Sequence, residues 1–437
     1  MFARLRKSEA GWSLMDQAAV SGGNFLTALV LARTLSPASY GTFSLLFLSL
    51  FAINTCHSSL VVYPLTLKVA TTSEGDLWRI NGTALVHTLA LGIPLSGVLA
   101  VVAFALHRLD LWPILAITMV GWQAQETARR VLLAGLRSSS AFLPDLVCYV
   151  GQGILLAVLR PKNLVYVFLI IAATSIIVAV WQFLIVRISL AGAFALDHCK
   201  YAWRVGGYIL AGNAMNMATL QVPSWTLALM AGTSAVAGYQ SLLNLVGVAN
   251  PIIFSVSNLL IPAVARGSLL GVAEARRTMY YYGSRYGLLL LPGFLALAIA
   301  PHRVMRLVYG ASSPYLHLAP LLGPFVLAFA LQYLATVVGA YEGGMERPKT
   351  YMWVQVAGTG ALLTLGIGLI HFYGIAGAVT AMVIASAARL LTFIVLSRAA
   401  DRRLLMGEGA PGGAPKGEPL ARPAANPSAH ACSEVGS

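Results

Sequence analysis

Long apolar stretches separated by short polar connections fill most of this 437-residue chain. Each stretch is long enough for a membrane helix, which needs roughly 20 residues, whereas a barrel strand needs only about 10 alternating ones. The pattern therefore predicts an all-α polytopic membrane protein with about 12 transmembrane helices. The predicted spans are Met15–Thr34, Gly41–Thr66, Asn81–Leu106, Leu111–Ala134, Ala141–Leu159, Leu164–Val186, Gly206–Met230, Val236–Val264, Tyr286–Val308, Leu318–Tyr341, Met352–Ile370 and Ile375–Ser397.

The connections between these spans divide the chain into two halves. The stretch 187–205, between the sixth and seventh spans, is one of the two longest connections. We therefore expect an N-terminal six-helix lobe at 1–186, a cytoplasmic linker at 187–205 and a C-terminal six-helix lobe at 206–405. Residues 406–437 are rich in Gly, Pro and Ala, which predicts a disordered cytoplasmic tail.

The two halves carry signs of an internal repeat. Because each half has an even number of spans, the repeat would be parallel, with a pseudo-two-fold axis along the membrane normal. Gly and Pro are also common in membrane helices as packing or kink residues, so a hinge role for them stays open. The matched pairs are Gly41 with Gly238 at a separation of 197, and Pro64 with Pro262 and Pro94 with Pro292 at 198.

Composition and charge support a membrane protein and exclude other classes. Only 10% of the residues are charged and 58% are hydrophobic, whereas soluble domains carry about 25% charged residues. With the N-terminus inside, 22 Lys and Arg residues lie near the inner face and six near the outer face. The net charge of +14 therefore reports topology by the positive-inside rule, with both termini cytoplasmic, and does not indicate a nucleic-acid partner.

The sequence gives no sign of a cofactor or metal site. The four cysteines have no paired spacing, so neither a disulfide framework nor a zinc site is indicated. There is no Walker loop, so the chain has no ATPase of its own. The outer connections reach at most nine residues, at Tyr309–His317, which leaves no room for a catalytic domain outside.

Three charged residues lie within the fourth span, in "GWQAQETARRVLLAGLR". A charge facing lipid at the bilayer centre costs about 2.5–3.5 kcal/mol, so these side chains should face the interior of the first lobe or a cavity between the lobes. Glu126 precedes Arg129 and Arg130 by three and four residues, the spacing of one-turn pairs on a helix. One Glu cannot neutralise two Arg, so we expect Asp145 and Asp16 as further partners.

This charged cluster has two main interpretations. One is a structural salt-bridge network that joins the fourth and fifth spans. The other is that Arg129 or Arg130 meets an anionic headgroup, because the guanidinium fork suits phosphate; anchoring of annular phospholipid is a third. Elsewhere, Arg389 in the last span could snorkel to the inner face or line a cavity. Asn24 and Gln221 could line the same cavity or make interhelical hydrogen bonds.

A basic and aromatic strip follows the eighth span. It comprises Arg276 and Arg277 with three consecutive tyrosines at 280–282. Such a strip is typical of an interfacial segment that contacts the lipid surface. The second half also carries Glu342, Glu346, Arg347 and Lys349 at the inner end of the tenth span, where a structural role is favoured.

Two segments resemble a known family. "DQAAVSGGNFLTALVLARTLSPASYGTFSLL" (Asp16–Leu46) is similar to the first hairpin of Wzx-like polysaccharide and oligosaccharide-lipid flippases of the multidrug/oligosaccharidyl-lipid/polysaccharide (MOP) exporter superfamily. "QETARRVLLAGLRSSSAFLPDL" (Gln125–Leu146) resembles their fourth-to-fifth span segment. The resemblance implies two six-helix lobes around a central cavity that opens alternately to either side. It also implies cationic cavity residues that meet a diphosphate.

The resemblance implies a polyprenyl-diphosphate-linked oligosaccharide as cargo, flipped across the bacterial inner membrane for exopolysaccharide or lipopolysaccharide synthesis. The lipid-II branch typically carries an Arg-Asp pair in its first span, and "NFLTALVLAR" has none, which favours a polysaccharide role. Membrane lipids, a polysaccharide polymerase and a chain-length regulator are the expected partners. The expectation is thus a transporter and not an enzyme.

Three rival interpretations remain open. A cation-coupled multidrug exporter of the same superfamily would need a membrane-embedded carboxylate, and only Asp16, Glu126 and Asp145 are available, all near the inner end. A membrane polysaccharide polymerase or glycosyltransferase would usually build its site on a sizeable outer loop. A structural scaffold would not need buried charges.

Overall fold

The computed structural model describes residues 2–71, 77–135, 137–189 and 196–406. The described part of the chain is almost entirely helical and contains no strand. The helices of the first half are α1 (Phe2–Thr34), α2 (Pro37–His57), α3 (Tyr63–Thr71), α4 (Leu77–Ala105), α5 (Trp112–Ala134), α6 (Ser138–Asp145), α7 (Gln152–Leu159) and α8 (Leu164–Val186). Those of the second half are α9 (Leu196–Ala231), α10 (Thr233–Gly247), α11 (Asn250–Ser268), α12 (Val272–Ile299), α13 (Pro301–Tyr309), α14 (Leu322–Gly344), α15 (Pro348–Ala361) and α16 (Ile367–Leu405).

Short turns of other helix types connect or interrupt these helices. Two are 3₁₀ turns, η3 (Leu109–Leu111) and η5 (Leu316–Leu321), which lead into α5 and α14. Three are π-helical turns, η1 (Ser58–Val62), η4 (Leu146–Gly151) and η6 (Leu362–Gly366). A π turn carries one more residue per hydrogen-bonded loop than an α turn, so each widens the span that contains it.

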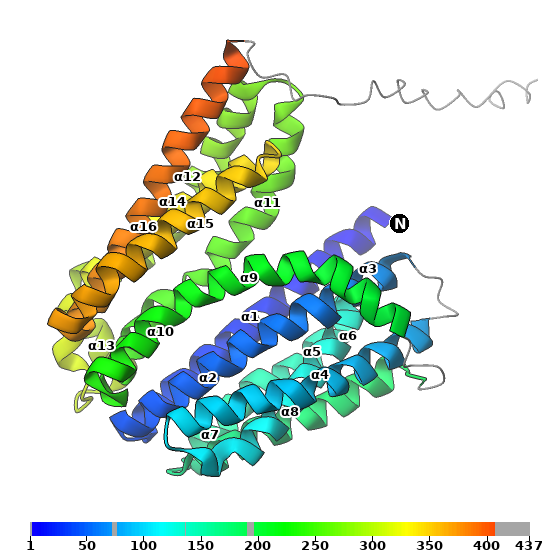
Figure 1. Cartoon of the computed structure of the whole chain (residues 1–437), viewed down its shortest axis with the longest axis vertical. Coiled ribbons are helices and arrows are strands. Elements are labelled where there is room, and N and C mark those ends of the chain that lie inside the picture. Colours follow the sequence, from blue (N-terminus) through cyan, green and yellow to red (C-terminus); the bar gives the residue numbers. More distant parts are fainter. Residues whose placement is uncertain (1, 72–76, 136, 190–195, 407–437) are drawn as a thin grey trace, which may run out of the picture.

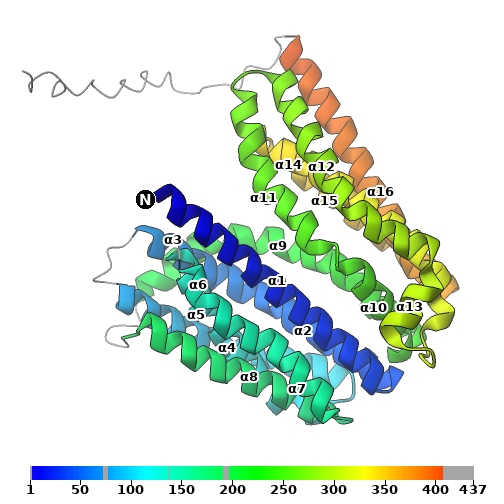
Figure 2. The same ribbon diagram turned by 180° about the vertical axis from the view of Figure 1, so that it is seen from behind.

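The helices form two groups that together make a V (Figure 1). The N-terminal lobe comprises α1 to α8 and the C-terminal lobe α10 to α16, while α9 contacts both α2 and α16 and runs between them. The lobes meet near α10 and α13 and diverge toward the end that carries the N-terminus, as the view from behind also shows (Figure 2). The two-lobe arrangement predicted from the sequence is confirmed.

Close packing and hydrogen bonds hold the lobes together where they meet. A Cβ atom on Gly41 of α2 would overlap the backbone carbonyl of Thr233 at the start of α10, so only glycine allows this approach. Nearby, Asn244 Nδ2 donates to Tyr40 Oη at 2.7 Å. At the end of α1, Arg33 Nε donates to the Val308 carbonyl of α13 at 2.6 Å, and a cation at a helix C-terminus is favourable.

The helix packing repeats from one lobe to the other. In the first lobe α5 packs against α4 and α8, and in the second α14 packs against α12 and α16. The interior prolines Pro94 of α4 and Pro292 of α12 hold matching places. The π turns η4 and η6 lie in the fifth and eleventh spans. Both lobes are therefore built on the same order of helices.

Several element boundaries differ from the predicted spans. α1 begins at Phe2, well before the apolar stretch, and α9 begins at Leu196, inside the stretch assigned to the linker. The eighth span is split into α10 and α11, with a proline in the first turn of α11. Spans eleven and twelve run into each other in α16, with a break at Gly374, whose φ is 54°. The tail predicted at 406–437 lies outside the described residues, apart from its first residue.

Eight helical segments of the described chain are long and apolar enough to cross a membrane. α5 does not reach that hydropathy because Glu126, Arg129 and Arg130 lie within it. It nevertheless packs between α4 and α8, two helices that do qualify. The charged stretch of the fourth span is thus enclosed by membrane-spanning helices.

Candidate functional site

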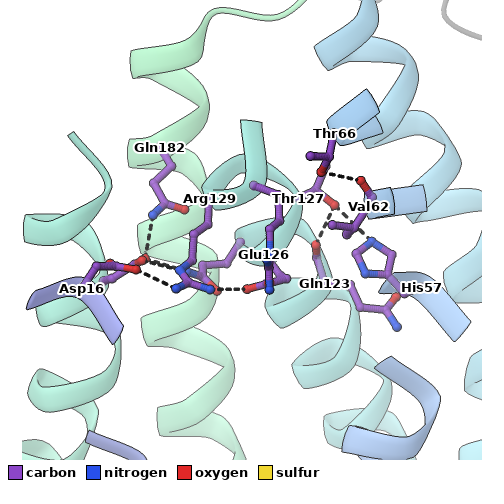
Figure 3. A network of polar contacts seen from close by, with 12 residues as sticks. Asp16, His57, Val62, Thr66, Gln123, Glu126, Thr127, Arg129 and Gln182 are labelled. Carbon is purple, nitrogen blue, oxygen red and sulfur yellow. Dashed lines mark hydrogen bonds and ion pairs between the residues drawn. The ribbon is translucent and has the colours of Figure 1, made fainter. Parts of the chain in front are cut away.

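The charged residues of the fourth span lie inside the N-terminal lobe, around the guanidinium of Arg129 (Figure 3). Arg129 Nε bonds Asp145 Oδ2 at 2.6 Å, and Nη2 bonds Asp16 Oδ2 at 2.6 Å. Nη1 bonds Glu126 Oε2 at 3.2 Å. The Arg129 side chain is 3% exposed, and Asp16 and Asp145 are fully buried. All three guanidinium nitrogens of Arg129 are therefore occupied by carboxylates.

Three elements bring this cluster together. Asp16 comes from α1, Arg129 and Glu126 from α5, and Asp145 from the end of α6, just before the π turn η4. The predicted one-turn pairs are present, because Arg130 Nε also bonds Glu126, at 2.6 Å. The two further partners expected from elimination, Asp145 and Asp16, are the ones found. The network joins the first, fourth and fifth spans.

Two glutamines complete the shell around Asp145. Gln125 Nε2 and Gln182 Nε2 donate to Asp145 Oδ1 at 2.9 and 2.8 Å. The position of Gln125, four residues before Arg129, was a signal that sequence reasoning passed over. Gln182 of α8 carried no such signal in the sequence, because the nearest charged residue along the chain is Arg187, five positions later. The Arg129 guanidinium is fully paired, which is typical of a structural role, while Asp16 Oδ1 and Gln182 Oε1 have no hydrogen-bond partner among the described residues.

The cluster is acidic on balance and differs in this from the expected cationic site. Two arginines, Arg129 and Arg130, face three carboxylates, which leaves a formal charge of −1 if all are ionised. The Arg130 side chain is 42% exposed, so it alone of the two arginines is open to a further partner. An anion from outside could therefore contact only the half-exposed guanidinium of Arg130. A cation could instead be balanced by the carboxylate that is in excess.

A second polar group lies beside this network in the same lobe. His57 Nε2 lies 3.1 Å from both Thr88 Oγ1 and Thr127 Oγ1, and the two hydroxyls lie 2.9 Å apart. Figure 3 shows Thr127, in the same turn of α5 as Glu126 and Arg129, and His57, at the end of α2, on the other side of Glu126 from Arg129. Gln123 is fully buried, and its side-chain atoms have no hydrogen-bond partner among the described residues. The N-terminal lobe thus carries polar groups deep in its interior.

Arg389 of α16 is placed very differently from Arg129. Its side chain lies on Gly358 of α15, where a Cβ atom would overlap the guanidinium. Nε and Nη2 are buried and have no hydrogen-bond partner among the described residues. No carboxylate of the described chain forms an ion pair with it. The residue as a whole is half-buried, and an ionisable residue without a charge partner inside a span is by default a functional-site candidate.

The two polar candidates have separate surroundings. Gln221 Nε2 of α9 donates to the Leu48 carbonyl of α2 at 2.6 Å, and its Oε1 accepts from Trp225 Nε1 at 3.2 Å. Gln221 therefore joins α9 to the first lobe. Of the two roles expected from the sequence, cavity lining or an interhelical hydrogen bond, the structure shows the hydrogen bond. Asn24 is exposed on α1. Neither residue lies in the Arg129 cluster.

The C-terminal lobe has a charged cluster that the sequence did not predict as one unit. Asp401 of α16 accepts from Arg276 of α12 at 2.9 Å and from Tyr341 of α14 at 2.8 Å. Arg347 lies 2.8 Å from Asp401 and 3.1 Å from Glu342. Asp401 lies beyond the last predicted span, so its pairing with residues from two other helices left no local pattern.

Comparison with solved structures relates this architecture to known transporters. A MOP superfamily transporter from Pyrococcus furiosus, whose binding pocket has reverse polarity, matches with 13% identity over 90% of this chain and 94% of its own, at a TM-score of 0.63. A MATE multidrug resistance transporter in an inward-facing conformation matches with 15% identity over 92% and 96%, at 0.62. The lipid II flippase MurJ matches with 12% identity over 89% and 87%, at 0.62.

At these identities the likeness shows the fold. No family model matches this sequence, and no curated protein matches it either. The chain is therefore a multi-pass membrane protein with the fold of MOP superfamily transporters, a class that includes both multidrug exporters and a lipid flippase.

Proposed function

We propose that this chain flips a polyprenyl-diphosphate-linked oligosaccharide across the bacterial inner membrane, for exopolysaccharide or lipopolysaccharide synthesis. The two lobes would expose a path alternately to either side, with both termini and the connection between α8 and α9 in the cytoplasm. A polysaccharide polymerase and a chain-length regulator are the proposed partners. The fold, shared with a lipid flippase, supports this proposal, as does the resemblance of Asp16–Leu46 and Gln125–Leu146 to Wzx-like flippases.

The observation that carries the proposal is the unpaired guanidinium of Arg389. A diphosphate that enters the hydrocarbon core of the membrane needs a cation there, and the arginine guanidinium binds phosphate through two parallel hydrogen bonds. Arg129 is already saturated by three carboxylates. Arg389 has two nitrogens without partners, within a helix that spans the membrane. We assign Arg389 to the cargo headgroup, Arg130 to a secondary contact, and Arg129, Glu126 and Asp145 to holding the first lobe.

The test is leaflet exchange of a fluorescent polyprenyl-diphosphate sugar in proteoliposomes, read by quenching of the outer leaflet. A hydrogen bond to a charged group contributes about 1.5–3 kcal/mol, so Arg389→Gln should slow exchange at least about tenfold. Arg277→Gln, at a side chain that is 82% exposed, is the matched control and should exchange like wild type. Exchange no faster than in protein-free liposomes would refute the function. Wild-type exchange in Arg389→Gln would remove that residue from the cargo path.

One observation favours a second function, a cation-coupled multidrug exporter. The Arg129 cluster holds one carboxylate more than it has arginines, deep inside the lobe. Buried carboxylates of this kind serve as proton relays in pumps and transporters. If the chain is an exporter, an acidic lumen should drive uptake of a cationic dye into the same proteoliposomes, and Asp145→Asn should abolish it. The sugar-lipid probe would then show no exchange.

A further inference from the structure

A groove runs along the outside of the C-terminal lobe, between α12 and α16 and over α14. It encloses about 760 Å³. All three helices belong to segments that qualify as membrane spans, and most of α12 is not covered by protein. Figure 1 shows the three helices side by side in this lobe. The groove therefore faces the hydrocarbon of the bilayer.

Two glycines bring α12 close to α14 and so form the groove. A Cβ atom on Gly283 would lie 2.9 Å from Val337 Cγ1, and one on Gly287 would lie 3.2 Å from Tyr333 Cε1. The missing side chains leave a depression along the contact. Beyond them the lining is apolar, with Leu290, Leu291, Phe294, Leu334, Val338 and Ile394.

The other end of the groove is polar and basic. It is lined by Arg276, Arg398, Asp401 and Ser397. Arg276 pairs with Asp401 at 2.8 Å, whereas no ion pair to Arg398 is found in the described chain, and its side chain is exposed. Ser397 is 7% exposed and its Oγ has no hydrogen-bond partner among the described residues. An exposed cation and an unpartnered buried hydroxyl thus meet at one end of an apolar channel.

The charge at this end remains positive after all internal pairs are counted. Three arginines, Arg276, Arg347 and Arg398, stand against two carboxylates, Glu342 and Asp401. Arg402 and Arg403 follow in the last turn of α16 and add to the positive field. Basic pockets between membrane helices bind the headgroups of anionic lipids. The groove is therefore complementary to a ligand with one anionic end and one apolar end.

The groove is longer than the hydrocarbon of one leaflet is deep, so it can hold a lipid from its headgroup to the end of an acyl chain. From Arg276 to Phe294 the 18 residues of α12 rise roughly 27 Å at about 1.5 Å per residue. The hydrocarbon of one leaflet is roughly 15 Å deep, half of the core. We propose that this groove binds an anionic glycerophospholipid of the surrounding bilayer. Its phosphate lies at Arg398 and Ser397 and one acyl chain lies along Leu290 and Phe294.

The internal repeat provides a natural comparison for this assignment. A groove of about 530 Å³ lies between α4, α5 and α8 of the first lobe. Its α4 lining, Leu85, Leu89, Gly92, Ile93 and Ser96, precedes Gly283, Gly287, Leu290, Leu291 and Phe294 of the second groove by 198 residues in every case.

The end of the first groove lacks the charges of the second. Phe183 and Leu184 of α8 precede Ser397 and Arg398 by 214 residues, as Ile176 of the first groove precedes Leu390 of the second. The repeat therefore places a groove in both lobes, and among the described lining residues only the second groove has basic side chains. The hydroxyl of the first groove, Ser96, already donates to the Ile93 carbonyl. A preference for an anionic headgroup should accordingly belong to the C-terminal lobe.

The test is native mass spectrometry of the full chain released from nanodiscs that contain equal amounts of phosphatidylglycerol and phosphatidylcholine with identical acyl chains. Wild type should retain phosphatidylglycerol in excess. Because a basic residue at the membrane surface contributes about 1 kcal/mol to anionic lipid binding, Arg398→Gln should lower phosphatidylglycerol retention about fivefold. Leu291→Trp fills the apolar part of the groove and should lower retention of both lipids.

Matched controls separate the groove from general effects. Arg303→Gln removes an exposed charge of α13, at the other end of the lobe from the basic end of the groove, and Ile93→Trp places the same bulky side chain at the matching position of the first lobe. Both should retain phosphatidylglycerol as wild type does. Equal retention of the two lipids by wild type, wild-type retention in Arg398→Gln, or an equal loss in the controls would each overturn the proposal. All replaced side chains are on the surface, and thermal unfolding of each variant checks its fold.

Discussion

The two lobes share one order of helices and each encloses an ionic network, but they differ in which arginines have carboxylate partners. The N-terminal lobe encloses its charges in the interior, where Arg129 is held by three carboxylates, and leaves its outer groove apolar. The C-terminal lobe leaves Arg389 without a carboxylate partner and sets Arg276 and Arg398 at the end of its outer groove. A repeated fold can thus carry its charges at different positions in its two copies, as a closed network around Arg129 in one and as arginines without a carboxylate partner among the described residues in the other.

The largest effect should come from Arg129→Leu. This change leaves Asp16, Glu126 and Asp145 buried without their shared cation, and breaking a buried ion pair costs about 3–5 kcal/mol. We expect a corresponding loss in the free energy of unfolding, measured by chemical denaturation of the purified protein in mild detergent. Arg130→Leu removes a half-exposed partner and should cost under about 1 kcal/mol. Equal losses in the two variants would contradict the closed network.

The next largest effect should be a difference in stability between alanine variants of two matched glycines, Gly41 and Gly238. In Gly41→Ala the new methyl group meets the rigid carbonyl of Thr233, and overpacking of this kind costs about 1–3 kcal/mol. In Gly238→Ala it meets only the ends of the Leu318 and Ile375 side chains, which can move, so the loss should be smaller. Thermal unfolding of both variants compares them, and a larger loss for Gly238→Ala would contradict the rigid contact between the lobes.

Arg389→Leu should change stability in the opposite direction from Arg129→Leu. Arg389 is half-buried and has no ion-pair partner among the described residues. Removing its charge relieves part of its desolvation cost, and we expect a gain of at most about 1 kcal/mol in the free energy of unfolding. The same denaturation experiment measures it. A loss of stability as large as that of Arg129→Leu would show that Arg389 has a structural partner, and the contrast between the lobes would fail.

The smallest effect should come from copying the basic end into the first groove. Leu184 is 75% exposed and precedes Arg398 by 214 residues, so Leu184→Arg adds a cation at the matching place without burying it. Retention of phosphatidylglycerol in native mass spectrometry should rise, by at most about fivefold. Leu184→Gln, which adds polarity but no charge, is the control and should retain lipid as wild type does.

Much of the fold could be predicted because membrane helices leave a strong local signal. The apolar spans, the two lobes and the repeat all follow from patterns within about 200 residues of one another. The pairing of Glu126 with Arg129 and Arg130 follows from helical spacing, and Asp145 and Asp16 follow from the need to neutralise them. The net charge of the Arg129 cluster was harder to predict from the sequence, since it depends on how many carboxylates contact the two arginines in the folded chain.

Other features could not be predicted because they depend on which helices cross. The isolation of Arg389 depends on its packing against Gly358 of another helix, with no carboxylate of the described chain paired to it. The pairing of Asp401 with Arg276 and Arg347 joins residues up to 125 positions apart. The basic strip at Arg276 and the three tyrosines predicted lipid contact, but the groove itself appears only once α12, α14 and α16 are packed together.

The π turns of the fifth and eleventh spans have a consequence for insertions and deletions. Each holds a surplus residue, so removing one residue from η4 or η6 could restore ordinary helical winding there while both flanks keep their orientation. The same removal from the middle of α5 would rotate every later side chain by about 100° and carry Arg129 away from its carboxylates. Relatives of this chain should therefore tolerate insertions and deletions of one residue at η4 and η6, but not in the middle of α5.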